Sequence, residues 1–90
     1  MPQTVRKPLV ANEAPKSAAL TSYDKEHVMI YLGLLDAEAE GADWMEASVT
    51  VLHIDPIREP ARAHRAWETH LSRAKWMAES GYRQLIRPVH

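Results

Sequence analysis

Five histidines are the residues of this 90-residue chain that could most readily bind a metal or transfer a proton. His53, His64 and His70 lack the i, i+4 spacing that places two ligands on one helical face, and no His-Glu-x-x-His motif occurs. The chain has no cysteine, so it has neither a thiolate metal site nor a disulfide framework. We therefore expect no metal and no cofactor.

Catalytic machinery is not indicated elsewhere. Gly33, Gly41 and Gly81 are isolated and form no phosphate-binding loop. Serine, histidine and aspartate all occur, but no spacing marks an activated nucleophile, and a domain of this size offers little room for a sheltered cleft. We expect that the protein is not an enzyme.

Basic residues on a predicted helix over residues 60–80 give the second possible chemistry, which is DNA binding. Arginines can contact guanine in the major groove, and hydroxyl groups can contact phosphate. The alternative is a solvated helix face held by pairs of the Arg65–Glu68 type. The candidate DNA-binding residues are Arg62, Arg65, Thr69 and Arg73.

Capping and proline signals position that helix. Asp43 and Glu46 form a capping box that begins a helix ending near His53. Residues 54–59 cannot continue the helix, because Pro56 lacks an N–H and disfavours helical geometry at the preceding residue. The next helix begins at Pro60, which suits a first helical turn, and Gly81 ends it. The outline is a helix-turn-helix with a six-residue turn, longer than the usual three or four residues.

A first helix is predicted from Thr21 or Ser22 to Gly41, and it carries two apolar stripes. Either another part of the chain covers the second stripe, or part of it stays open for a partner. The first stripe contains Val28, Tyr31, Leu32, Leu35 and Ala39, and the second contains Tyr23, His27, Ile30, Leu34 and Ala37.

Both ends of the chain lie outside these helices. Residues 1–20 contain three prolines and no sustained periodicity, so we predict a flexible tail, with the domain spanning residues 21–90. Tyr82, Leu85 and Ile86 follow Gly81, and we expect them to form a short C-terminal helical turn. Trp76 falls on the polar side of the third helix, where either that turn shelters it or it is exposed for a partner. No period-2 alternation occurs, so the predicted fold is an all-α, helix-turn-helix-like bundle of three main helices without a β wing.

Charge is distributed unevenly along the chain. The net charge is -1, but residues 21–54 carry seven acidic residues against Lys25 alone. Residues 55–90 carry seven basic residues against four acidic ones. DNA-binding domains usually have a basic excess overall, so this balance favours a protein partner. No apolar run is long enough to span a membrane, and residues 1–10 do not resemble a signal peptide, so we expect a cytoplasmic protein.

The spaced tryptophan, Asp-Pro and Gly-Tyr elements resemble the proteobacterial domain of unknown function 2285. The similarity covers roughly residues 21–87. The runs that carry it are residues 34–44, 53–56, 66–77 and 81–83.

The resemblance implies a helix-turn-helix variant with an extended turn. In two-domain relatives that activate excision and transfer genes of integrative and conjugative elements, one face of this domain binds DNA and the other docks on a separate N-terminal domain. A single acidic copy is expected to bind that N-terminal domain instead and to act as an antiactivator, linked to a LuxR-type quorum-sensing regulator. DNA binding is then weak or absent. The predicted docking residues are Tyr23, His27, Ile30, Leu34, Trp76 and Tyr82.

Overall fold

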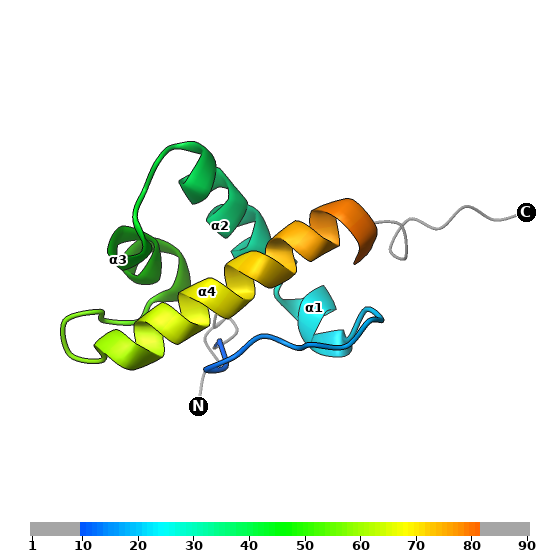
Figure 1. The fold of residues 1–90 in the computed structure, drawn as a ribbon, viewed down its shortest axis with the longest axis horizontal. Coiled ribbons are helices and arrows are strands. Elements are labelled where there is room, and N and C mark those ends of the chain that lie inside the picture. The colour runs from blue at the N-terminus through cyan, green and yellow to red at the C-terminus, as the bar shows by residue number, and fades with distance from the viewer. Residues whose placement is uncertain (1–9, 82–90) are drawn as a thin grey trace, which may run out of the picture.

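The computed structural model describes residues 10–81, which fold as a bundle of helices (Figure 1). No β-strand occurs in these residues, so the prediction of an all-α fold without a β wing is confirmed. The elements are α1 (Ser22–Glu26), α2 (Val28–Ala39), α3 (Trp44–Ala47), the π-helical turn η1 (Ser48–Leu52), α4 (Pro60–Trp76) and the π-helical turn η2 (Met77–Gly81).

The first predicted helix is broken into two. Thr21 caps α1 with a capping box, because its side chain accepts from Asp24 N–H and the Asp24 carboxylate accepts from Thr21 N–H. His27 then leaves helical geometry at φ -115° and ψ 21°. Its ring Nδ1 lies 2.7 Å from the Tyr23 carbonyl oxygen, a local side-chain-to-backbone bond that competes with a regular helix. The single helix expected over residues 21–41 is therefore wrong at His27. Gly41, at φ 81°, follows α2 as predicted.

The second predicted helix consists of α3 and η1. Asp43 caps it by accepting from Glu46 N–H at 2.9 Å. The helix ends at His53, which adopts a left-handed conformation at φ 59°, and Ile54 N–H then bonds back to the Ser48 carbonyl.

The turn between α3–η1 and α4 has its own hydrogen bonds. The Asp55 carboxylate accepts from the backbone N–H groups of Ile57 and Arg58, at 2.9 and 3.3 Å. Pro60 occupies the first turn of α4, where no N–H is needed. The predicted turn over residues 54–59 and the helix that follows it are confirmed.

The core lies between α4 and the α2–α3 pair. Ala63, Ala66 and Ala74 of α4 are fully buried, and these small side chains let α4 approach its neighbours closely. Leucine and isoleucine side chains fill the remaining space, each contributing about 1.5–3 kcal/mol when fully buried. The larger buried hydrophobic residues here are Val10, Leu34, Leu52, Ile54 and Leu71.

Residues 10–20, which we call the N-terminal strap, lie along α4 and lead into α1 (Figure 1). Val10 and Ala14 of the strap are buried. The prediction of a flexible tail is therefore wrong for residues 10–20, which belong to the folded domain. It failed because the partners of this segment, on α4, are about 50 residues away in sequence. Residues 1–9 lie outside the described part of the chain.

None of the helices within residues 10–81 combines the length and the apolar composition needed to cross a membrane.

Candidate functional site

The second apolar stripe of the first predicted helix faces the core. Leu34 is 1% exposed and His27 is buried, while Tyr23 and Ile30 are half-buried. Leu34 and His27 therefore cannot contact a partner unless the core opens, which corrects their choice as docking residues. Of the two alternatives left open by the sequence, coverage by the same chain is the one found.

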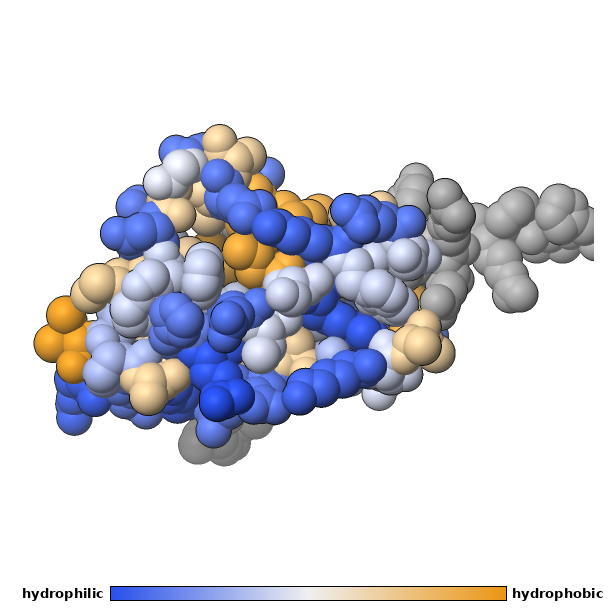
Figure 2. All heavy atoms as spheres, in the orientation of Figure 1, coloured by the Kyte–Doolittle hydropathy of each residue, from blue (hydrophilic) through white to orange (hydrophobic). Residues whose placement is uncertain are grey.

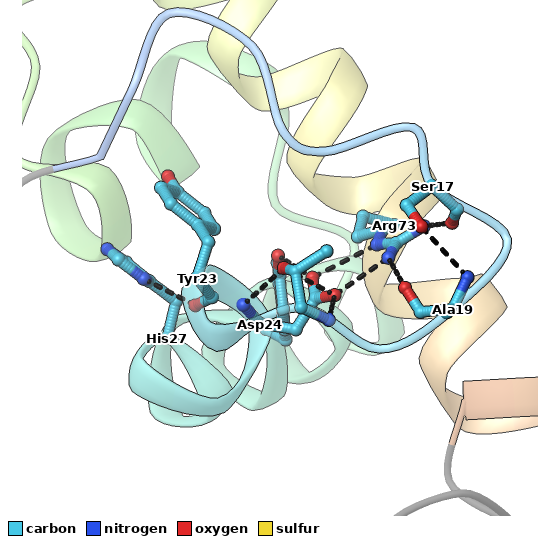
Figure 3. A network of polar contacts seen from close by, with 8 residues as sticks. Ser17, Ala19, Tyr23, Asp24, His27 and Arg73 are labelled. Carbon is cyan, nitrogen blue, oxygen red and sulfur yellow. Dashed lines mark hydrogen bonds and ion pairs between the residues drawn. The ribbon is translucent and has the colours of Figure 1, made fainter.

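A buried ion pair joins α1 to α4 (Figure 3). The Arg73 Nε and Nη2 atoms donate to the two carboxylate oxygens of Asp24 at 3.0 and 2.7 Å. Tyr31 Oη donates to the same carboxylate at 2.7 Å, and Thr21 N–H donates at 2.9 Å. Both charged side chains are buried, and such a pair needs this full set of hydrogen bonds to offset its desolvation.

The network sets the charge states of its members. Burial by itself would raise the pKa of Asp24, but the hydrogen bonds from Arg73, Thr21 and Tyr31 outweigh burial and hold that pKa far below its ordinary value. Burial, together with the hydrogen bond to the carboxylate, raises the pKa of Tyr31. Asp24 is therefore an anion and Tyr31 a neutral donor at neutral pH, and the cluster is structural.

A second polar chain runs from the strap into α4. Ala11 N–H donates to Tyr23 Oη at 2.9 Å, and this oxygen lies 2.6 Å from His70 Nε2. His70 Nδ1 lies 2.7 Å from the Ala66 carbonyl oxygen, which can only accept, so Nδ1 carries the hydrogen and Nε2 accepts from Tyr23. Burial lowers the pKa of His70. His70 is therefore a neutral core histidine.

The basic stripe of α4, formed by Arg62, Arg65, Thr69 and Arg73, contacts the strap. Arg62 Nε donates to Asn12 Oδ1 at 2.9 Å, and Arg65 Nη1 donates to Glu13 Oε2 at 2.5 Å. Thr69 Oγ1 accepts from Ala14 N–H at 3.0 Å. The structure thus brings all four candidate DNA-binding residues together on one face and gives each an intramolecular partner. The strap carries no local sequence signal for these contacts.

Arg73 has the fullest set of partners in the basic stripe. Besides Asp24, its guanidinium donates to the Ser17 and Ala19 carbonyl oxygens at 2.6 and 3.1 Å (Figure 3). The same group lies over the Trp76 ring, with Cζ 3.9 Å from the ring centroid. Trp76 is therefore half-buried, and Arg73 covers one face of its ring. Tyr82, also predicted to dock a partner, lies outside the described residues.

An apolar groove of about 300 Å³ lies between α2 and the C-terminal end of α4. Leu32, on its α2 side, is 49% exposed. Figure 2 shows one face of the molecule as mostly hydrophilic, with hydrophobic atoms gathered along the seam between α2 and α4. The first apolar stripe, rather than the second, is thus the one left partly open. The groove is lined by Val28, Tyr31, Leu32, Leu35, Ala74, Met77 and Ala78.

Acidic residues gather at the C-terminal end of α2. Asp36 and the capping residue Glu40 are exposed, whereas Glu38 pairs with Lys75 of α4 at 2.9 Å. Chemically, the arrangement offers an apolar surface beside negative charge.

Within residues 10–81, no group of three or more potential ligands among His, Cys, Asp and Glu is placed to hold a metal.

No protein-family model matches the chain, and no curated protein matches it. The family resemblance suggested by the sequence motifs stays a prediction.

Proposed function

We propose that this protein is an antiactivator that binds the N-terminal domain of a transcriptional activator and blocks activation of the excision and transfer genes of a conjugative element. The observation that carries the proposal is the apolar groove between α2 and α4, with Leu32 half-exposed at its edge. An apolar groove is a surface in which a partner helix can bury its own apolar side chains. The motif resemblance supplies the class of partner.

The proposed occupant of the groove is an amphipathic helix of the activator with basic flanking residues. A helix places apolar side chains at i, i+3/i+4 and i+7 in such a groove. Basic flanks match the exposed Asp36 of α2, the exposed Glu40 that follows the helix, and the excess of acidic residues in the segment from residue 21 to 54. Complementary charge speeds association and rejects acidic competitors. This groove replaces the second stripe as the proposed docking surface.

Competition is the proposed mechanism. By offering the surface that the activator's own DNA-binding domain presents, the antiactivator separates the activator's two halves. The tethered domain acts at an effective concentration in the millimolar range. The free protein must therefore bind more tightly than the tethered copy, or bind before the activator's domains associate.

Sequence-specific DNA binding is the less favoured function. The residues that would carry it are engaged by the strap, and Arg73 is also buried against Asp24. The chain is slightly acidic overall, which opposes approach to a polyanion.

The two functions are separated by two titrations of the purified protein. In the first, the isolated N-terminal domain of the cognate activator is added and complex formation is followed by calorimetry. In the second, promoter DNA is added at increasing salt concentrations. The proposal expects a saturable protein complex and little DNA binding at physiological salt. Tight promoter binding with a steep salt dependence, and no heat from the activator domain, would reverse the assignment.

A further inference from the structure

The basic stripe is the cation-rich face of α4. Its members recur at helical spacings of three and four residues, so they form one continuous line along the helix. The adjacent exposed face differs, because Glu68 and Glu79 offset Lys75 there. If α4 contacts a polyanion, the basic stripe is therefore the face that does so.

The strap runs alongside this line in the same direction as α4. Asn12, Glu13 and Ala14 meet Arg62, Arg65 and Thr69 in that order. The Glu13 carboxylate and the Asn12 amide oxygen occupy the positions on the two guanidinium groups that phosphate oxygens would take. At the two arginines the strap thus presents oxygen acceptors as a nucleic-acid backbone would, whereas at Thr69 it donates an N–H group.

The strength of attachment varies along the strap. Val10 and Ala14 are buried on either side of Asn12 and Glu13, and Arg73 donates to two strap carbonyl groups further along. The contacts that Asn12 and Glu13 make are exposed: the Arg65 side chain keeps 61% of its surface accessible. Exposed ion pairs of this kind are weak and screened by salt. The strap is therefore fixed on both sides of Asn12 and Glu13, while the side-chain contacts of these two residues open readily.

We propose that residues 10–20 are an autoinhibitory strap that excludes nucleic acid from the basic stripe of α4. The strap blocks the approach of a duplex to this flank and neutralises Arg65 through Glu13. Release of the Asn12 and Glu13 side chains frees Arg65 for phosphate, while Arg62 keeps its ion pair with Glu59 at 3.2 Å and Arg73 stays in the core. The device accounts for the weak or absent DNA binding expected of a helix-turn-helix-like domain that carries a row of arginines, and it is independent of the partner that fills the apolar groove.

The test compares the whole chain with the double variant Asn12→Ala/Glu13→Gln, in binding to a short mixed-sequence DNA duplex at several salt concentrations. Both substituted side chains are exposed, and circular dichroism checks the fold. The variant is expected to bind more tightly, and its plot of log K against log salt should steepen by about one, for Arg65 alone, because Arg62 keeps its ion pair with Glu59. Adding Arg65→Gln to the double variant should remove this increase in slope.

Glu40→Gln is the matched control, because it makes the same change in net charge on an exposed residue at the end of α2. Its salt slope should equal that of the unmodified chain. An equal gain in Glu40→Gln would show a general charge effect and overturn the proposal. An unchanged slope in the double variant, or in Glu13→Gln alone should the double variant fail to fold, would overturn it as well.

Discussion

At the scale of single residues, Asp24 makes the most consequential contacts in the domain. Its carboxylate accepts from Arg73, Tyr31 and the Thr21 backbone, so it joins the start of α1 to α2 and α4. A buried charge with a full set of donors is tolerated, but removal of one charge leaves the other unpaired in the core. Stability is therefore expected to depend on this pair far more than on any surface ion pair.

Asp24→Asn should lower the free energy of unfolding by about 3–5 kcal/mol, because it leaves the Arg73 guanidinium buried without its counter-ion. Urea unfolding followed by circular dichroism measures the change. Glu38→Gln is the control, since it breaks the half-exposed pair with Lys75 and should cost about 1 kcal/mol or less. Equal losses of unfolding free energy in the two variants would mean that the buried pair contributes no more to stability than the half-exposed pair.

His70 predicts a pH dependence of stability. Because burial lowers its pKa in the folded state, the unfolded chain takes up a proton first as the pH falls. Stability should be constant above about pH 7.5 and should decrease as the pH falls through about 6.5, the ordinary pKa of histidine. The decrease ends once the pH is below the folded-state pKa.

Urea unfolding at pH 7.5, 6.5 and 5.5 tests this expectation, because these values bracket the ordinary histidine pKa of about 6.5. His70→Gln should flatten the dependence. The same slope in the variant and the unmodified protein would show that the pH dependence arises elsewhere.

Local residue chemistry could be predicted where both partners are close in sequence. Asp43, three residues before Glu46, caps α3 as expected, and Thr21, one of the two residues expected to begin the first helix, caps α1. The pairing of Asp24 with Arg73 could not be predicted, because 49 residues separate them and both residue types are usually exposed.

At the scale of elements, periodicity identified the helical segments but not the face that each one buries. Two stripes on α2 had similar apolar content, and only the position of α4 decides between them. α4 packs over Leu34, while Leu32 and Val28 are left at the groove. The break at His27 was missed because its cause, a ring bonded to the Tyr23 carbonyl, leaves no mark in a hydrophobic pattern.

Alanine substitutions on α2 test this orientation. Leu34→Ala should cost about 2–5 kcal/mol of unfolding free energy, because it opens a cavity in the core. Leu32→Ala, two residues earlier and half-exposed, should cost about 0.5 kcal/mol. Thermal or urea unfolding of the two variants gives the comparison, and the reverse order of losses would contradict the assigned orientation of the helix.

At the scale of the whole molecule, opposite charges lie on different parts of the fold. Exposed acidic residues lie on α2, the helix that forms one wall of the apolar groove, and the arginines of α4 contact the strap. Composition could predict that residues 21–54 carry an excess of negative charge and residues 55–90 an excess of positive charge. It could not predict that the N-terminal segment folds across the basic stripe, because the prolines and small residues of that segment resemble a linker.

The central claim is that the groove between α2 and α4 binds the activator. Leu32→Asp places a charge at the groove, whereas Met29→Asp makes the same chemical change on α2 at a residue that is 77% exposed and outside the groove. The measurement is the dissociation constant of each variant for the activator's N-terminal domain.

We expect Leu32→Asp to weaken binding by about 30-fold or more, the size of a hot-spot loss, and Met29→Asp to change it by about threefold at most. Both variants should keep their helical circular dichroism spectra. Unchanged affinity in Leu32→Asp, or an equal loss in both variants, would contradict the assignment of the groove as the docking site.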